Sequence, residues 1–296
     1  MGALRPNLGT MAIEDLRTVG ELTARLTDRL GRLMPAGGRL DRLTAELTAA
    51  YAGDGSPVDG SACRAVEALA QRHSQHLELH FAPDGTGSDV EMPGWPPPDP
   101  DEVRSRGAGV GAVRRLEDGT CVVALDTLDA VGPARPYLDA AAALARGSRR
   151  LVLDLRANGG GDPGTVAAVA GWLLGDRATQ LSEVIYRDRR RQWWTADRPP
   201  GSAFTGDVTV LVSARTYSSA EALAYHLAAR GRVTVVGEPT RGAADHVVPV
   251  HLSRRVLGLL PEAEVIDAHS GGNWEGTGVV PDVACPAADA LEKALA

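Results

Sequence analysis

The sequence contains almost no lysine. Lys293 is the only lysine among 31 basic residues, and the other 30 are arginines. A reaction that depends on a buried lysine therefore has almost no residue to use. Aromatic residues make up only 4% of the chain and hydrophobic residues 44%, so aliphatic side chains and alanine must fill the core. The 296 residues are enough for one large domain or two modest ones.

Other absences exclude further classes of protein. No apolar run reaches the roughly 18 residues of a membrane-spanning helix, and the first residues lack the apolar stretch of a signal peptide. We therefore expect a cytoplasmic protein with no membrane span. The three cysteines form no CxxC pair, so neither a disulfide framework nor a cysteine zinc site is expected. A formal charge of -7 argues against a nucleic-acid partner, and the one basic cluster, residues 187–191, is local.

The hydrophobic pattern changes along the chain. Apolar residues recur at three- and four-residue steps over residues 13–52, which predicts amphipathic helices, and a further helix is expected over 62–70. Alternation of polar and apolar residues over 76–81 predicts a strand. From residue 122 onward predicted strands alternate with predicted helices, which is typical of an α/β fold. The domains expected are a helical cap over 1–82, a Pro- and Gly-rich linker over 83–109 and a core over 110–296.

A glycine run follows the most apolar of the predicted strands. Leu151–Leu155 leads into Asn158-Gly159-Gly160-Gly161 and then into a helical pattern. Glycines accept positive φ and allow neighbouring N–H groups to converge on an anion. A phosphate cradle, an oxyanion hole and a tight turn without function all remain open. The phosphate-loop pattern GxxxxGK[ST] is absent, and no lysine is available to complete it.

Two other segments have the composition of functional loops. Thr216-Tyr217-Ser218-Ser219-Ala220-Glu221 lies where a predicted strand meets a predicted helix. A serine at a helix N-terminus lies where the helix dipole favours developing negative charge. The same residues also fit a capping box, with Glu221 three positions after Ser218. Further along, residues 273–282 surround Glu275 with two glycines, a proline and a tryptophan, which indicates a shaped loop.

Together and in this order, these segments resemble one serine peptidase family. It includes the C-terminal (tail-specific) processing peptidases, the tricorn core protease and the interphotoreceptor retinoid-binding protein. Residues 154–161 resemble its DLR-x-NGGG block, and 216–221 resemble its T-x-S-[AS]-x-E nucleophile block. Residues 237–242 resemble G-E-x-T-x-G, and 273–282 resemble NWEG-x-GV-x-PD. The likeness covers roughly residues 60–296 and implies a ClpP/crotonase-like ββα core with an N-terminal helical cap.

The resemblance also implies catalytic residues. Ser218 matches the nucleophile, and His76 matches the histidine of the family's D-x-H-L pattern, whose aspartate is replaced here by Ser74. Glu275 matches the family's glutamate, which would orient the base or stabilise its charge. The position of the processing peptidases' lysine holds Ala243. The chain therefore resembles the tricorn and retinoid-binding-protein branch, which has no lysine dyad or PDZ domain, and a Ser-His-Glu arrangement is expected.

Alternatives remain for the other parts of the site. His246 follows the G-E-x-T-x-G block and is the second candidate for the base. The backbone N–H groups of Ser219 and Gly160 are the expected oxyanion hole, with Gly159 and Gly161 as alternatives. No metal and no cofactor are expected, because the closely spaced histidines near residue 76 fall in a predicted strand and no HExxH pattern is present.

These observations predict a serine hydrolase. The simplest expectation is a peptidase that cleaves peptide bonds through an acyl-enzyme on Ser218, with a histidine as general base. One alternative is a non-catalytic carrier of a lipophilic ligand, as in the retinoid-binding members. Another is a biosynthetic amide or ester hydrolase or an acyl transferase. The expected partner is a peptide or a small acyl substrate, and self-assembly into a homo-oligomer is left open.

Overall fold

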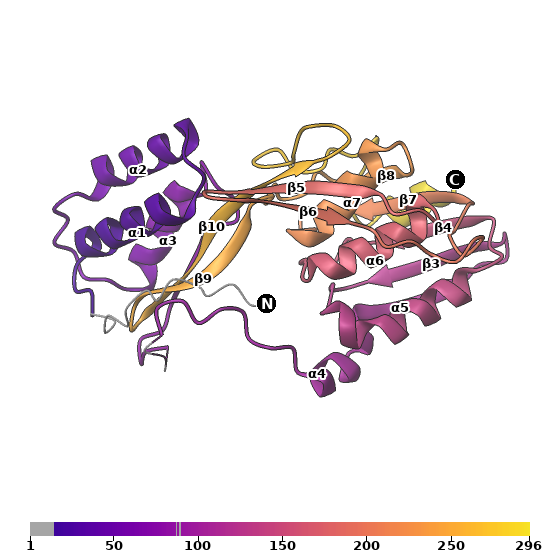
Figure 1. The fold of residues 1–296 in the computed structure, drawn as a ribbon, viewed down its shortest axis with the longest axis horizontal. Helices are drawn as coiled ribbons and strands as arrows, with labels where there is room; N and C mark the ends of the chain where they lie inside the picture. The colour runs from indigo at the N-terminus through magenta and orange to yellow at the C-terminus, as the bar shows by residue number, and fades with distance from the viewer. Residues whose placement is uncertain (1–14, 87, 89) are drawn as a thin grey trace. The chain divides into compact units, whose positions relative to one another are not determined.

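The computed structural model describes residues 15–296 except 87 and 89, and its chain forms two compact units (Figure 1). The start of the expected cap, residues 1–14, lies outside the described residues. The first unit holds the described residues up to His73 together with Leu77–Pro96 and Val247–Glu262, and the second holds Ser74–His76, Pro97–His246 and Ala263–Ala296.

This division differs from the one expected from the sequence. Residues 247–262 were expected in the core but fold with the N-terminal helices, whereas 97–109 belong to the second unit and not to a separate linker. Residues 74–76 also belong to the second unit. All residues proposed above for the site therefore lie in the second unit.

The first unit combines three helices with one whole strand, β1, and parts of two others, β9 and β10. The helices are α1 (Val19–Leu33), α2 (Gly38–Tyr51) and α3 (Gly60–Ala70), and the strands are β1 (Glu78–Phe81), β9 (His246–Ser253) and β10 (Val256–Asp267). Helix α1 begins at a capping box formed by Thr18 and Glu21. Leu22, Leu26 and Leu30, spaced by four, are fully buried, so the predicted amphipathic helix is confirmed.

Strand β1 is shorter than the expected strand over 76–81. It pairs in antiparallel fashion with β10, where Glu78 lies opposite Leu259 and Phe81 opposite Val256. His76 precedes this ladder and lies in a turn. The expectation of a strand at His76 was therefore wrong, because the alternation of residue types continues beyond the residues that have a pairing partner.

The second unit is built on a six-stranded sheet. Its order is β11-β8-β7-β4-β3-β2, and the bounds are β2 (Val110–Arg115), β3 (Thr120–Leu125), β4 (Arg150–Asp154), β7 (Asp207–Val212), β8 (Thr234–Gly237) and β11 (Val283–Ala284). The remaining elements are α4 (Pro100–Ser105), a 3₁₀ turn (Gly107–Gly109), α5 (Val131–Ala145), α6 (Pro163–Leu174), α7 (Ser219–Ala229), α8 (Ala290–Leu295) and the hairpin of β5 (Gln180–Tyr186) and β6 (Arg190–Trp194). The predicted α/β fold class is confirmed.

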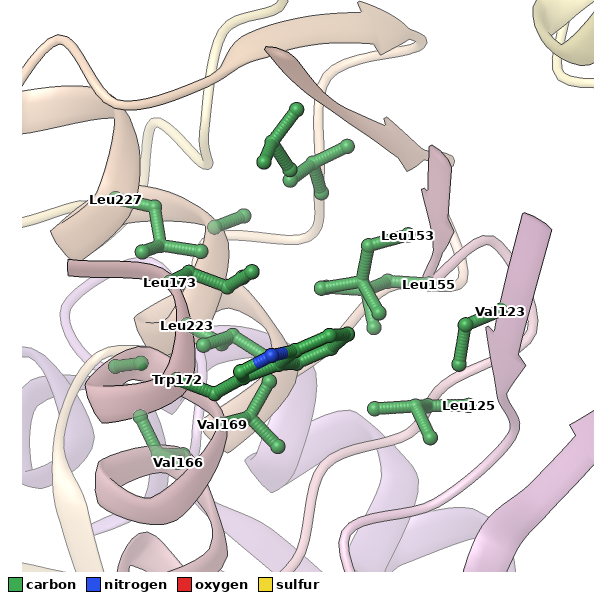
Figure 2. Packing of buried hydrophobic residues seen from close by; sticks show 14 of the residues in the cluster. Val123, Leu125, Leu153, Leu155, Val166, Val169, Trp172, Leu173, Leu223 and Leu227 are labelled. Carbon is green, nitrogen blue, oxygen red and sulfur yellow. The ribbon is translucent and has the colours of Figure 1, made fainter. Parts of the chain in front are cut away.

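Alternation along the strands assigns helices to the two faces of this sheet. Val123 and Leu153 join the cluster that includes residues of α5, α6 and α7, whereas their neighbours Val122 and Val152 join a cluster with α8. Figure 2 shows the Trp172 indole of α6 lying among aliphatic side chains of both the helices and the strands. Because aromatics are few, this core is otherwise mainly leucine, valine and alanine.

The parallel strands place the candidate segments at one edge. Strands β3, β4, β7 and β8 run parallel to one another, so their carboxyl ends meet at the same edge of the sheet, where open α/β sheets bind ligands. The loops that leave this edge are residues 155–161 after β4, 213–218 after β7 and 238–245 after β8. None of the helices in the described part of the chain combines the length and apolar character needed to cross a membrane.

Candidate active site

Ser218 lies in a sharp turn between β7 and α7. Its backbone has φ 54° and ψ −123°, a conformation that a residue with a side chain rarely adopts. Such strain costs on the order of 1–3 kcal/mol and is found where the surrounding structure enforces it, often at functional sites. The Ser218 N–H donates to Oε2 of Glu221 at 2.8 Å. The geometry therefore presents a half-buried serine at the start of a helix.

Glu221 is fully buried one turn into α7 and binds the loop after β8 as well as Ser218. Its Oε1 accepts from the Thr240 hydroxyl at 2.6 Å and from the Gly242 N–H at 2.6 Å, and its Oε2 accepts from the Ala243 N–H at 3.0 Å. Burial raises the pKa of Glu221, while these hydrogen bonds oppose the rise. The predicted contact between Glu221 and Ser218 is present, but the link to the loop was not visible in the sequence.

The glycine run lies directly against Ser218. Gly160 has φ +100°, and a Cβ there would lie 2.9 Å from Cβ of Ser218 and 2.9 Å from the Tyr217 carbonyl oxygen. A side chain at position 160 would therefore displace the serine. The Gly160 N–H donates to Oδ1 of Asn158 at 2.8 Å, and this use weighs against Gly160 as an oxyanion donor. The Ser219 hydroxyl donates to the Gly161 carbonyl at 2.8 Å.

His76 is nearly buried and lies beside the residue that precedes Ser218. Its ring meets the Tyr217 ring edge-on, with centroids 5.0 Å apart and planes at 82°. Its Nδ1 lies 2.5 Å from the carbonyl oxygen of Asp245. A carbonyl oxygen can only accept, so Nδ1 carries the proton. In the neutral ring Nε2 is therefore the nitrogen with a lone pair, which is the form that a general base requires.

Glu275 holds the backbone on both sides of this histidine contact. Its Oε1 accepts from the Gln75 N–H at 2.7 Å, and its Oε2 accepts from the N–H groups of Ala244 at 2.7 Å and Asp245 at 3.2 Å. The carboxylate thus fixes the residue before His76 and the residue whose carbonyl binds the His76 ring. This arrangement lets Glu275 position the histidine through the main chain.

Asp245 is a site residue that the sequence reasoning missed. Its buried carboxylate accepts a hydrogen bond from the buried Ser74 hydroxyl at 2.6 Å, Oγ to Oδ2. Ser74 stands where the resembled pattern has an aspartate, and Asp245 supplies a carboxylate beside it. The missing aspartate at position 74 was the signal that could have prompted a search for a carboxylate elsewhere.

The remaining predicted residues take other positions. His246 begins β9, and its ring centroid lies 6.2 Å from that of Tyr186. Ala243, at the position of the family's lysine, is buried, and its carbonyl accepts from Nε1 of Trp274 at 3.1 Å. Among the described residues, no three His, Cys, Asp or Glu side chains gather in an arrangement that could hold a metal ion.

Comparison with known proteins identifies the family and supports the fold. Residues 120–285 match Peptidase family S41. A candidate peptidase from Parabacteroides merdae is 14% identical with a TM-score of 0.65, covering 95% of this chain and 96% of its own. A lipoprotein from Streptococcus agalactiae is 14% identical with a TM-score of 0.58, covering 100% and 97%. The two likenesses support the fold.

A third similar structure is a photosystem II D1 C-terminal processing protease. It is 26% identical over 60% of this chain and 46% of its own, with a TM-score of 0.47. The family match itself covers more than half of the residues and includes both Ser218 and Glu275. The chain therefore belongs to Peptidase family S41, and it is a serine peptidase.

Proposed function

We propose that the protein cleaves peptide bonds through an acyl-enzyme on Ser218, with His76 as the general base. The observation that carries this proposal is that one loop, residues 238–245 after β8, holds the segments of both residues in place. Thr240, Gly242 and Ala243 of the loop bind Glu221, which holds the Ser218 N–H. Residues 244–245 bind Glu275, which holds the segment of His76. Such preorganisation is what a nucleophile and its base require.

The proposed chemistry begins with attack of the Ser218 hydroxyl oxygen on the substrate carbonyl. Nε2 of His76 takes the hydroxyl proton and later gives it to the leaving amine, so that the acyl-enzyme forms and the C–N bond breaks. A water molecule then attacks the acyl-enzyme while His76 takes its proton; the ester bond to Ser218 Oγ breaks, His76 returns the proton to that oxygen, and the acid product is released. The imidazolium formed in each step keeps its Nδ1 hydrogen bond to the Asp245 carbonyl.

For the oxyanion hole we propose the N–H groups of Ser219 and Gly159. Within the described part of the chain, neither N–H donates a hydrogen bond, whereas the Gly160 N–H is taken up by Asn158. Ser219 lies at the N-terminus of α7, where the helix dipole favours the developing negative charge. Loss of one such donor typically lowers turnover by about 10²–10³.

Glu275 completes the proposed Ser-His-Glu arrangement as a positioning residue. It acts on His76 through the N–H groups of Gln75 and Asp245, and its negative charge would stabilise the imidazolium. His246 remains the alternative base, because it adjoins Asp245 in the chain. The predicted cytoplasmic location stays a prediction, for which fractionation of cells is the test.

A fluorophosphonate probe tests the nucleophile. The wild-type protein should be labelled covalently and Ser218→Ala should not, while Ser219→Ala should still be labelled because its hydroxyl is not the proposed nucleophile. Equal labelling of wild type and Ser218→Ala would overturn the assignment. Digestion of a peptide library then separates a peptidase from a hydrolase of small acyl substrates, which would cleave esters or amides but leave the library intact.

A further inference from the structure

Arg241 is an exposed arginine held against the residue next to the proposed nucleophile. Its guanidinium carbon lies 5.1 Å from the centre of the Tyr217 ring. Its own N–H approaches the Thr216 carbonyl oxygen at 3.4 Å, and the following N–H, that of Gly242, is bound by buried Glu221. The side chain is therefore attached to a fixed piece of backbone and rests on an aromatic face.

Arg241 makes no ion pair within residues 15–296, leaving aside 87 and 89. Two arginines of the same unit do form ion pairs: Arg156 with Asp154 at 2.7 Å, and Arg230 with Asp267 at 2.7 Å. The acidic residue closest to Arg241 in sequence, Glu238, accepts the Ala287 N–H at 3.1 Å. An exposed cation without an ion-pair partner therefore lies beside the residue that precedes Ser218.

The distances limit where a ligand of this arginine would lie. The guanidinium carbon and the His76 ring centroid both lie close to the centre of the Tyr217 ring, at 5.1 and 5.0 Å. The guanidinium therefore lies at most about 10 Å from the His76 ring, which corresponds to roughly three residues of extended peptide. A substrate bound for cleavage would place several of its groups within this range.

We propose that Arg241 binds a carboxylate of the substrate within about three residues of the scissile bond. A guanidinium stacked on an aromatic ring keeps its N–H edges open, and these edges match the two oxygens of a carboxylate. The carboxylate belongs to an acidic side chain or to the C-terminus of the peptide. This inference rests on the proposed function and adds the substrate class: peptides with a negative charge near the cleaved bond.

Competition against fluorophosphonate labelling of Ser218 measures this binding without requiring cleavage. One set of short peptides contains pairs that differ by Glu or Gln at a single position. A second set contains pairs that differ by a free or an amidated C-terminus. We expect the charged member of at least one pair to compete about tenfold better with the wild-type protein, equivalent to about 1.4 kcal/mol. The set in which this happens identifies the source of the carboxylate.

Variants assign the preference to Arg241. With Arg241→Gln the preference should disappear, and with Arg241→Glu the corresponding lysine peptide should compete better than the glutamate peptide. Arg114→Gln is the matched control, because it removes the same charge from an exposed position on β2, which is one edge strand of the sheet. Arg241 follows β8, which lies next to the other edge strand, β11. The control should leave the preference unchanged.

The two proposals fail in distinguishable ways. Wild-type protein that is not labelled at all would overturn the proposed nucleophile. Wild-type protein that is labelled but shows no preference in either peptide set would overturn only the role of Arg241. A preference that persisted undiminished in Arg241→Gln would also overturn that role and leave the nucleophile untouched.

Discussion

Two glutamates hold the two halves of the candidate site, and they do so in different surroundings. Glu221 is fully buried inside a helix and accepts four hydrogen bonds, including one from Ser218. Glu275 is half-buried in a loop, and the N–H groups that donate to it include those of Gln75, beside His76, and of Ala244 and Asp245. Every one of these donors is an uncharged N–H or O–H group.

The loop after β8 divides its donors between the two glutamates. Thr240, Gly242 and Ala243 donate to Glu221, and the next two residues, Ala244 and Asp245, donate to Glu275. A buried carboxyl group whose oxygens accept several hydrogen bonds is expensive to disturb. We therefore expect Glu221 to matter mainly for stability and Glu275 mainly for the placement of the base.

The largest expected effect is that of Glu221→Gln on stability. An amide group offers one acceptor oxygen in place of two, so its NH₂ would face buried N–H donors that have lost their partner. We expect the free energy of unfolding to fall by about 3 kcal/mol, measured by urea denaturation.

The matched control is Glu21→Gln. Glu21 closes a capping box like that of Glu221, but it is exposed, and it accepts the N–H groups of Arg17 at 2.8 Å and Thr18 at 3.2 Å. Its substitution should lower the urea midpoint far less than Glu221→Gln does. Equal losses of unfolding free energy in the two variants would mean that the stabilising effect of Glu221 does not depend on its burial.

The next largest effect is that of Glu275→Gln on the rate of fluorophosphonate labelling. Loss of one acceptor oxygen should free either Gln75 or the Ala244–Asp245 backbone, and displacement of a catalytic group by about 1 Å costs about 10² in rate. We expect labelling to slow by about that factor while the urea midpoint changes little.

Glu238→Gln serves as the control for this comparison. Glu238 also accepts backbone N–H groups, those of Ala214 at 3.5 Å and Ala287 at 3.1 Å, without a contact to the His76 segment. The Glu238→Gln variant should be labelled by the fluorophosphonate at the wild-type rate. Unchanged labelling of Glu275→Gln would remove Glu275 from the site.

The contrast between the two glutamates also explains what could be read from the sequence. Ser218 and the glycine run were predicted because each lies in a short contiguous motif at the end of a strand. The pairing of Ser74 with Asp245 joins residues 171 positions apart, and the loop donors of Glu221 are backbone groups that have no signature in residue type. Residues 247–262 were assigned to the core for a similar reason, since strand periodicity does not say which sheet a strand joins.

A smaller effect is expected from exchanging Ser74 and Asp245. Ser74→Asp alone would place two carboxylates side by side in a buried position, and Asp245→Ser alone would remove the acceptor of the Ser74 hydroxyl. Each single variant should slow labelling about tenfold, since the pair orders the segment that carries the His76 contact.

The double variant Ser74→Asp, Asp245→Ser restores one acid and one hydroxyl in exchanged positions. It should recover most of the wild-type labelling rate. Ser61→Ala, which removes an exposed hydroxyl bound to Asp59 at 2.7 Å, should have no effect on labelling. A double variant no better than the slower single variant would show that the pair does not act as a unit.

The smallest expected effect is a difference between Glu221 and Glu21, the two glutamates of capping boxes, in how their contribution to stability depends on pH. Burial raises the pKa of Glu221, so the folded protein holds this proton more tightly than the unfolded chain, whose glutamates titrate near 4.3. The stability that Glu221 contributes is therefore fully present below that pH and is lost as the pH rises through the folded-state value. The hydrogen bonds from Arg17 and Thr18 lower the pKa of Glu21, so the stability that Glu21 contributes is present above about pH 4.3 and is lost as the pH falls.

Urea denaturation between pH 3 and 7 measures both effects. The difference in the free energy of unfolding between wild type and Glu221→Gln should narrow with rising pH, while the difference between wild type and Glu21→Gln should widen. Parallel slopes would show that burial does not distinguish the two carboxylates.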